Sequence, residues 1–395
     1  MTVPTGCPAC LGDSTEIIHR APGLPTNSCL LVDDLDTALA YPRGDMALTI
    51  CCECGFVYNA AWDGSSQYDS SYEETQTHSA TFRAFATGLA ADWVDRHELG
   101  GRSVIEIGCG SAGEFLQMMV DAGAGRATGI DPALKVDRID RPDADHFEWL
   151  PRPYDATYGP IDHDAVVCRH TLEHIGPVHD FMVEVRKGIG DRTDVAVLFE
   201  LPDVARVLQD AAFEDVYFEH CSYFSAGSLA RLFRRTGFRV TGLERAYDDQ
   251  YLLIEAHPAP AHEIDGPALD LEDDLASTVA DARRYQERLD AVSAHWAARL
   301  GEVTAGGGKN VIWGGGSKAV AFLTTLGLAD EISAAVDINP VKQGRYLAGT
   351  GHRVIAPDEL VDLKPELVVA MNSIYIPEIQ ANLDRLDVGT RLEGL

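Results

Sequence analysis

The chain has 395 residues with a formal net charge of −30, and its 46% hydrophobic content is that of a soluble globular protein with two or three domains. The acidity argues against a protein that binds the phosphate backbone of nucleic acid, because such binding needs clustered Lys and Arg. No apolar run reaches the roughly 20 residues of a membrane span. The first residues lack the basic region and apolar stretch of a secretory signal. We therefore expect a cytoplasmic protein, a monomer or weak homodimer, that binds a small molecule and neither nucleic acid nor membrane.

Residues 1–75 form the first expected unit, a small zinc-binding module. This stretch is rich in turn-forming residues and carries two C-x-x-C pairs, Cys7 with Cys10 and Cys51 with Cys54. Four thiolates suit the tetrahedral coordination of Zn²⁺, and four protein ligands leave no open position, which implies a structural ion. Free thiols are the alternative, whereas disulfides are not expected in a reducing compartment.

Residues 76–257 form the second expected unit, in which apolar strands alternate with helical stretches. The predicted strands cover 103–107, 127–130, 164–168 and 195–199. Alternation of this kind is typical of an α/β domain with a parallel sheet covered by helices. The sequence therefore predicts a Rossmann-like domain here.

The strand at 103–107 runs directly into a glycine loop. Gly108, Gly110 and Gly113 match the G-x-G-x-x-G fingerprint, and a helical stretch follows. Asp131 ends the next strand, about 20 residues after the glycines, where an acid would hold ribose hydroxyls. On spacing alone, an NAD-dependent dehydrogenase therefore competes with a methyltransferase that uses S-adenosylmethionine (SAM).

Two neighbouring features favour SAM over NAD. Glu106 lies inside the strand end, two residues before the first glycine, where the methyltransferase version of this turn has an acid that supports the loop and the methionine ammonium. The segment 164–175 resembles the fourth-strand segment of class I methyltransferases, whose end faces the transferring methyl group. The residues expected to bind SAM are Glu106, Gly108, Gly110, Asp131, Arg169 and His170.

The same fourth-strand segment contains an H-x-x-E-H sequence, formed by His170, Glu173 and His174. This pattern matches the inverted motif of a class of zinc proteases, which needs a helix so that both His side chains face one metal ion. Here the motif follows a buried strand directly, so we disfavour a metalloprotease. His174 is expected to pack or to brace the loop.

Residues 258–304 are expected to hold a linker and a long helix. The linker is placed at 258–262, where two prolines interrupt regular structure. Apolar residues from Leu271 to Leu300 then recur at the spacing of one helical face, which indicates a packing helix rather than a binding element.

Residues 305–395 are predicted to form a smaller Rossmann-like α/β domain. Strands are expected at 310–313, 332–336 and 367–370, with a helix at 317–326. A second glycine loop, 314–316, precedes that helix. The loop either cradles a phosphate through its backbone N–H groups or only packs, and Lys318, Lys342 or Arg345 would add positive charge to a phosphate site.

The order of these parts resembles the three-domain, SAM-dependent sugar C-methyltransferases of antibiotic deoxysugar pathways. The most specific piece is 216–225, in which Tyr217, Glu219 and His220 match the Y-x-E-H segment of that family and an S-Y-x-S segment follows. A second piece is 336–346, which is similar to a C-terminal signature of the family. The resemblance covers nearly the whole chain.

The resemblance implies methylation at C3 of a thymidine-diphosphate-linked 4-keto-6-deoxysugar. Such a reaction needs a base for the α-proton and donors for the enolate. His220 is expected to be the base, since imidazole titrates near neutral pH. Glu219 would orient His220 or hold a sugar hydroxyl, and Tyr217 would donate to the developing oxyanion.

The family analogy also places the nucleotide sugar against Tyr72, Lys318, Lys342 and Arg345. Two substrate-facing regions differ from the family pattern. His170 stands where the compared enzymes have Asn, and the tyrosine-rich segment 68–79 keeps only part of its motif. O- or N-methylation of another metabolite is therefore one alternative, and a non-catalytic zinc protein with a SAM fold is another.

Overall fold

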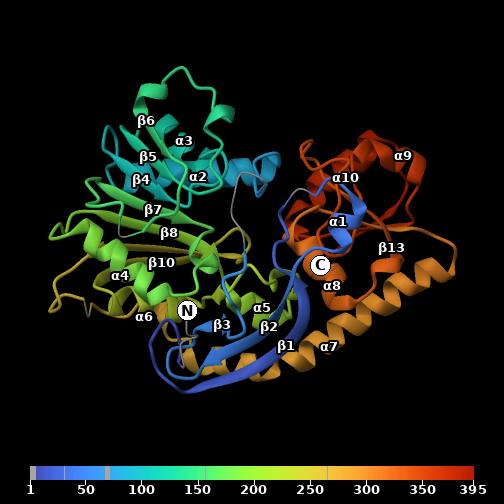
Figure 1. Ribbon diagram of the computed structural model, residues 1–395, viewed down its shortest axis with the longest axis horizontal. Helices are drawn as coiled ribbons and strands as arrows, with labels where there is room; N and C mark the ends of the chain where they lie inside the picture. The colour runs from blue at the N-terminus through green and yellow to red at the C-terminus, as the bar shows by residue number, and fades with distance from the viewer. Residues whose placement is uncertain (1–5, 31, 67–71, 156, 265) are drawn as a thin grey trace.

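The computed structural model describes residues 6–30, 32–66, 72–155, 157–264 and 266–395, so Tyr68 of the tyrosine-rich segment lies outside the described residues. The described chain contains three β-sheets, one in each main part of the sequence. In Figure 1 the central sheet and the C-terminal sheet lie side by side, and the N-terminal strands run below them.

The N-terminal sheet is antiparallel and takes its last strand from much later in the chain. Its order is β1-β2-β3-β9. The strands are β1 (Thr15–Pro25), β2 (Arg43–Cys51), β3 (Val57–Asn59) and β9 (Ser222–Tyr223), and the short helix α1 (Leu35–Leu39) precedes β2. Val57 pairs with Tyr223 and Tyr58 with Ser222. This pairing fixes the segment that directly follows His220.

The central sheet has the order β10-β11-β8-β7-β4-β5-β6. Its strands are β4 (Val104–Ile107), β5 (Ala127–Ile130), β6 (Phe147–Leu150), β7 (Ala165–Arg169), β8 (Ala196–Pro202), β10 (Phe238–Ala246) and β11 (Tyr251–Pro258). β6, β5, β4, β7 and β8 are parallel, whereas β11 runs antiparallel to β8. The order reverses between β4 and β7, so their carboxyl ends flank a ligand crevice.

Helices cover both faces of the central sheet because successive strand residues point to opposite sides. Val104 and Val167 pack under α2 (Ala80–Arg96) and α3 (Glu114–Asp121). Ile105 and Val166 pack instead under α4 (Val178–Ile189) and α6 (Ala226–Arg235). The helix α5 (Val204–Asp210) follows β8. The expected Rossmann-like domain is confirmed.

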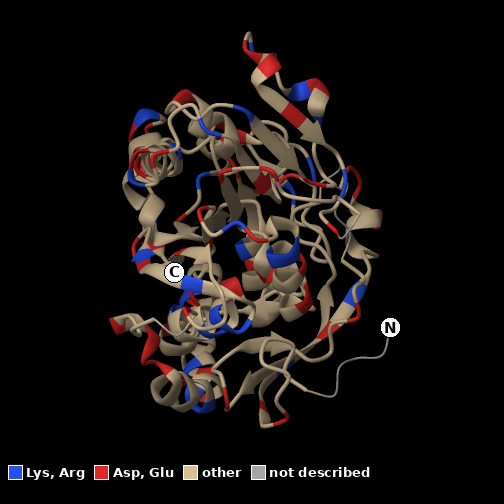
Figure 2. Ribbon diagram, turned by 90° about the vertical axis from the view of Figure 1, so that its left-hand side faces the viewer, with Lys and Arg blue, Asp and Glu red and all other residues tan. Residues whose placement is uncertain are grey.

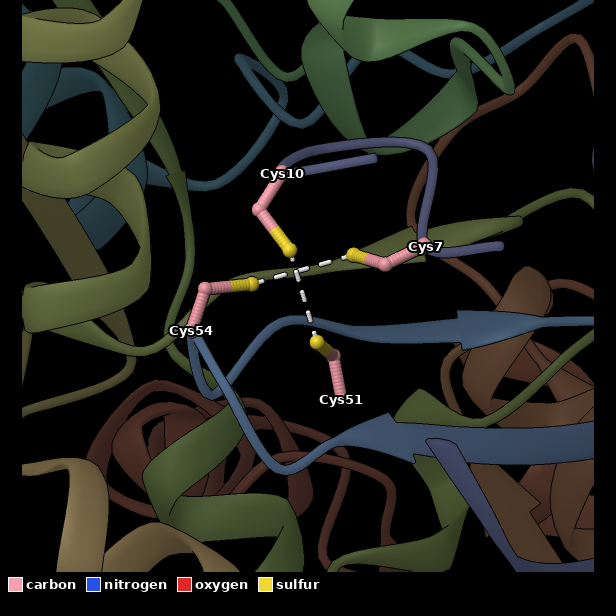
Figure 3. A group of neighbouring side chains, drawn as sticks. All are labelled: Cys7, Cys10, Cys51 and Cys54. Carbon is pink, nitrogen blue, oxygen red and sulfur yellow. Dashed lines mark hydrogen bonds between the residues drawn. The ribbon is translucent and has the colours of Figure 1, made fainter. Parts of the chain in front are cut away.

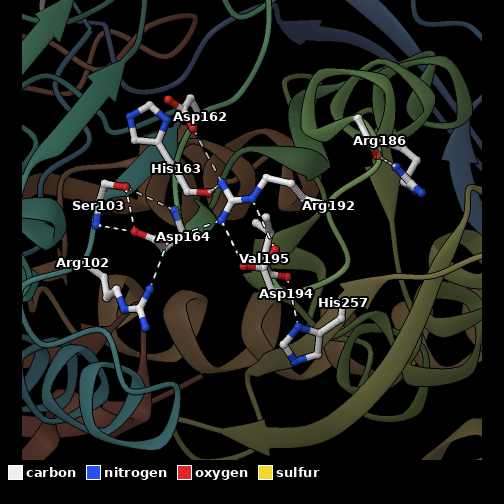
Figure 4. A network of polar contacts seen from close by, with 11 residues as sticks. Arg102, Ser103, Asp162, His163, Asp164, Arg186, Arg192, Asp194, Val195 and His257 are labelled. Carbon is white, nitrogen blue, oxygen red and sulfur yellow. Dashed lines mark hydrogen bonds and ion pairs between the residues drawn. The ribbon is translucent and has the colours of Figure 1, made fainter.

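A polar network ties the amino ends of the strands, opposite the crevice (Figure 4). The Ser103 backbone N–H donates to the Asp164 carboxylate at 2.9 Å, just before β4 and β7 begin. Arg192 approaches the same carboxylate at 3.3 Å and donates to the His163 carbonyl at 2.7 Å. These contacts align the strands and lie away from the carboxyl ends, so we assign them a structural role.

The C-terminal sheet is wholly parallel, in the order β14-β13-β12-β15-β16. Its strands are β12 (Asn310–Trp313), β13 (Ile332–Val336), β14 (Val354–Ile355), β15 (Leu367–Ala370) and β16 (Arg391–Gly394). The helices are α7 (Leu275–Ala305), α8 (Ser317–Leu326), α9 (Leu360–Leu363) and α10 (Ile376–Arg385). α7 runs along the lower edge in Figure 1 and packs with the N-terminal strands and α8 in one core.

Two local expectations differ from the structure. Pro258 is the last residue of β11, paired with Phe238, because a proline at a strand end costs no essential ladder donor. The long helix begins at Leu275, and Leu271 lies in a separate 3₁₀ turn. Asp274 directly precedes this helix, and its carboxylate accepts from Arg231 at 2.8 Å instead of capping the first helical turn.

Charged positions of both signs are interspersed on the face that Figure 2 turns to the viewer. Among the described residues, no helix combines the length and the apolar character that a membrane crossing requires.

Candidate active site

One cavity of about 560 Å³ lies where the three parts of the chain meet. The carboxyl ends of β4 and β7 contribute Glu106 and Arg169, and the segment before β9 contributes His220. Tyr72 reaches the cavity from the N-terminal part, and Trp313 from the end of β12. Both Rossmann-like sheets therefore present their ligand-binding edges to the same space.

The first glycine loop forms one wall of this cavity. Gly108 and Gly110 have φ angles of +76° and +72°, which favour glycine. A Cβ on Gly108 would lie 1.9 Å from Thr171 Oγ1, so the loop approaches the end of β7 closely. The Gly110 N–H donates to Asp131 Oδ2 at 3.0 Å. The loop and Asp131 are thus brought together as the spacing predicts.

The segment 145–149 does not line this cavity in the described structure. The Trp149 ring packs on Gly113, where a Cβ would lie 2.3 Å from it. Pro153 and Tyr154, which follow β6 in the chain, line the cavity instead.

Glu106 is only 2% exposed, and its Oε2 atom has no hydrogen-bond partner. Burial raises the pKa of Glu106 to about 7, although Arg169 acts in the opposite direction. A buried carboxyl with an unsatisfied oxygen beside a glycine loop is suited to a cationic ligand.

Arg169 and His170 converge on a carboxylate that the sequence analysis did not select, Glu200 of β8. Arg169 Nε lies 2.5 Å from Glu200 Oε2, and His170 Nε2 lies 3.1 Å from Oε1. Burial lowers the pKa of His170, but Glu200 and Glu173 outweigh it and raise the pKa to about 9. His170 is therefore an imidazolium at neutral pH, held on a left-handed backbone with φ +47°.

His220 and Tyr217 form a buried pair inside the cavity. The Tyr217 hydroxyl lies 2.7 Å from His220 Nε2. Burial, together with the charges of His174, His170 and Lys318, holds the pKa of His220 well below its usual range. Burial also raises the pKa of Tyr217, so the phenol keeps its proton beside a neutral imidazole. A neutral imidazole is the form that accepts protons.

His174 and Glu219 lie next to this pair and hold its segment in place. His174 Nδ1 lies 3.2 Å from the Glu219 carbonyl, which can only accept, and the His174 ring meets His220 edge-on at 4.8 Å. The Glu219 carboxylate points toward Ser28, whose hydroxyl donates at 2.5 Å, rather than toward the His220 ring. Ser28 also contacts the Ser317 hydroxyl at 2.9 Å, so this chain of contacts reaches α8.

Three of the four residues expected to bind the sugar nucleotide line the cavity: Tyr72, Lys318 and Lys342. Lys318 is paired with Asp215, and Lys342 Nζ lies 3.6 Å from Asp337. Arg345 points elsewhere. Its guanidinium pairs with Asp33 and donates to the Val341 carbonyl at 3.1 Å, since the chain turns at Gly344, where φ is +83°.

The second glycine loop repeats the contacts of the first. The Gly315 N–H donates to Asp337 Oδ2 at 2.8 Å, as Gly110 does to Asp131. Asp337 directly follows β13, which is the next strand in the chain after this loop. Asp337 was not among the predicted site residues, although its place after the second loop parallels that of Asp131 after the first.

The four cysteines of the N-terminal part converge on one point (Figure 3). The Cys7 and Cys54 sulfurs are 3.7 Å apart, the Cys10 and Cys51 sulfurs are 3.5 Å apart, and all four lie within 4.8 Å of one another. A tetrahedral Zn²⁺ with bonds of about 2.3 Å separates its sulfurs by about 3.8 Å. The described geometry therefore fits such an ion. Arg231 of α6 donates to the Cys54 carbonyl at 3.0 Å, which docks this cluster on the central domain.

Two family descriptions match the chain. A methyltransferase domain matches residues 82–243, and a C-methyltransferase C-terminal domain matches residues 266–391. The chain therefore combines a methyltransferase domain with a C-methyltransferase C-terminal domain. It is a SAM-dependent enzyme, and its resemblance to the three-domain sugar C-methyltransferases is confirmed.

The enzyme is similar to the C-methyltransferase NovU of Streptomyces niveus, with 28% identity over 303 residues that cover 71% of this chain and 69% of NovU. The N,N-8-amino-8-demethyl-D-riboflavin dimethyltransferase RosA of Streptomyces davawensis is 20% identical, with a TM-score of 0.36, over 45% of this chain and 56% of RosA. The 1,6-didemethyltoxoflavin-N1-methyltransferase of Burkholderia thailandensis is 16% identical, with a TM-score of 0.34, over 49% of this chain and 95% of that chain.

Glu200 is the residue of the methyltransferase site that sequence reasoning should have found. It is an acid between Phe199 and Leu201 in an otherwise apolar strand, and its side chain is 0% exposed. A charge at such a position needs a buried partner. Arg169 and His170, at the end of the preceding strand, were the available cations.

Proposed function

We propose that this methyltransferase transfers the methyl group of SAM to a carbon next to the keto group of a nucleotide-linked deoxysugar, in natural-product biosynthesis. The carrying observation is the neutral His220, with Nε2 2.7 Å from the Tyr217 hydroxyl, inside the cavity that holds the SAM loop. The match to a C-methyltransferase C-terminal domain and the similarity to NovU support carbon as the acceptor atom.

Proton removal is the step assigned to His220. Its neutral ring takes the proton of the α-carbon, and the C–H electron pair becomes the enolate. In the proposed tautomer of His220, Nδ1 carries the ring proton and Nε2 accepts from the Tyr217 hydroxyl. Once His220 carries the extra proton it no longer accepts from Tyr217, so the phenol is released to donate to the enolate oxygen. The enolate carbon then forms the new C–C bond as the S–CH₃ bond breaks.

The SAM site is assigned to Glu106, Gly108, Gly110 and Asp131, with Arg169 and His170 at the neighbouring strand end. The unpartnered Glu106 Oε2 supports an ammonium at this loop, and Asp131 is placed for ribose hydroxyls. When bound, SAM supplies the electrophilic methyl group. The imidazolium of His170 lies at the β7 end, where it favours an anionic acceptor oxygen.

The nucleotide part of the acceptor is assigned to the second glycine loop. Backbone N–H groups at the start of α8 suit a phosphate, and Lys318 and Lys342 bring positive charge to the same cavity wall. Tyr72 faces them from the N-terminal part. Arg345 is left out of this assignment because it does not line the cavity and its guanidinium pairs with Asp33.

We also propose that Cys7, Cys10, Cys51 and Cys54 bind one structural Zn²⁺. Four close thiol sulfurs without a cation would repel one another once ionised, and the cluster has no open position for a substrate. The ion would hold the two knuckles together and so stabilise the N-terminal sheet, whose β3 pairs with β9 beside His220.

The base assignment is tested with a His220→Asn variant. We expect turnover to fall by at least roughly 100-fold, as for loss of a general base, while binding of S-adenosylhomocysteine stays within about twofold of wild type. A Tyr217→Phe variant should keep part of the activity, because the base remains. Turnover of His220→Asn near the wild-type rate would remove His220 from the mechanism.

A further inference from the structure

The residues 72–79 cross the first glycine loop as a strap, and they bring a carboxyl to it. The Ser111 N–H donates to Glu74 Oε1 at 2.8 Å. A Cβ on Gly110 would lie 2.7 Å from the same oxygen. Glu74 therefore sits directly against the loop on which the SAM assignment rests, although it comes from outside the methyltransferase sheet.

The strap is anchored on both sides of Glu74, which fixes the position of this carboxyl. Before it, Glu73 pairs with Lys135 at 3.4 Å and Arg138 at 3.2 Å. After it, the Thr75 and Thr77 hydroxyls each donate to the Glu114 carboxylate at 2.5 Å. The Ser79 hydroxyl then donates to Glu378 of α10 at 2.7 Å, which ties the strap to the C-terminal domain.

Glu74 Oε2 and Glu106 Oε2 are buried carboxylate oxygens that make no hydrogen bond to any residue in the described ranges. Both residues line the cavity. Burying such oxygens without a hydrogen-bond partner costs free energy. A cation or a hydrogen-bond donor of a ligand is therefore expected beside them. Arg169 pairs with Glu200 through Nε and Lys135 pairs with Glu73. Arg169 Nη2 makes no hydrogen bond to a described residue, so it does not satisfy Glu106 Oε2 either.

We propose that Glu74 binds the α-ammonium of SAM together with Glu106, so that the strap closes the methionine end of the cofactor site. The inference rests on the assignment of SAM to this loop. The ammonium is favoured over the sulfonium because it carries three N–H donors, whereas the sulfonium carries none.

The assignment makes a distinction between ligands. SAM and S-adenosylhomocysteine both carry the ammonium, so both need Glu74. 5′-Methylthioadenosine lacks the amino-acid part and does not. Glu74→Gln keeps the size of the side chain but removes its charge. Glu287→Gln is the control, because it makes the same change at an exposed carboxyl of α7 outside the cavity lining.

The test is calorimetric titration of the full chain. We expect Glu74→Gln to lose roughly tenfold to hundredfold in affinity for SAM and for S-adenosylhomocysteine, as for a hydrogen bond to a charged group. Its affinity for 5′-methylthioadenosine should stay within about twofold, and Glu287→Gln should bind all three as wild type does. A Glu74→Asp variant, which restores the charge, should recover part of the loss.

Three results would overturn the proposal. One is wild-type affinity of Glu74→Gln for S-adenosylhomocysteine. The second is an equal loss for 5′-methylthioadenosine, which would mean that the strap only shapes the pocket. The third is a loss for SAM alone, which would assign Glu74 to the sulfonium. None of these depends on His220, so failure of the carbon-methylation proposal would be seen separately, in turnover.

Discussion

Burial beside the glycine loop disfavours the ionised forms of the Glu106 and Glu74 carboxyls. Burial raises the pKa of each to about 7, and neither has a cation strong enough to reverse the effect. The neighbouring Asp131 raises both further through its negative charge. Each group therefore binds a proton near neutral pH when no ligand is present, and a bound ammonium would expel it.

The pH dependence of cofactor binding follows from this. Ionised carboxylates bind the ammonium, so affinity for S-adenosylhomocysteine should be highest above pH 7 and fall as the pH decreases. Below pH 7 each of the two acids must release a proton on binding, which costs about tenfold in affinity per pH unit and per proton. Titrations at pH 6 and pH 8, in buffers of different ionisation enthalpy, measure both quantities. Equal affinity at the two pH values without proton release would contradict the assignment.

Sequence reasoning found His220 because it lies in a distinctive Tyr-x-Glu-His segment. The same reasoning expects Glu219 to orient His220 or to hold a sugar hydroxyl, and in the structure its carboxylate accepts from the Ser28 hydroxyl. Glu74 was not selected, because nothing in its local pattern shows that the strap crosses a loop formed about 35 residues later. Such contacts between distant segments have no signature in one sequence.

The strands around the glycine loops were predictable because each is a short apolar run bounded by turn residues. The structure places β5 at Ala127–Ile130 and β12 at Asn310–Trp313, as expected. The two-residue strand β9 was not predictable, since Ser222 and Tyr223 have no periodicity to detect. Its pairing with β3 depends on the tertiary arrangement that brings the N-terminal sheet to the His220 segment.

The cysteine knuckles give a direct prediction about the N-terminal sheet. Cys51 ends β2 and is one of the four converging sulfurs, whereas its neighbour Cys52 is outside that group. We expect purified protein to hold about one zinc per chain, and Cys51→Ser to lose it. Loss of a structural metal costs several kcal/mol, so the melting temperature should fall by roughly 5–10 °C.

Cys52→Ser is the matched control for this prediction and should keep both the metal and the melting temperature. Elemental analysis of protein purified without added zinc, paired with thermal unfolding, measures both. Folded protein with a zinc content near zero would remove the metal from the account.

The assembly of the three sheets around one cavity is the feature that no local pattern contained. The strap joins Glu73 to the central domain and Ser79 to α10, and a reciprocal pair of buried amides, Gln250 with Asn372, bridges β11 to the end of β15 at 2.7 and 3.2 Å. These contacts hold the two glycine loops face to face. The first glycine loop, His220 and the second glycine loop therefore line one cavity, as a single transfer reaction would require.

Carbon as the methylated atom is the central claim, and the product tests it most directly. The full-length enzyme is incubated with SAM carrying a carbon-13 methyl group and a thymidine-diphosphate-linked 4-keto-6-deoxysugar, and the product is examined by NMR. We predict a labelled methyl bonded to the carbon beside the keto group, with no such product from His220→Asn. A labelled methyl on oxygen or nitrogen would contradict the account.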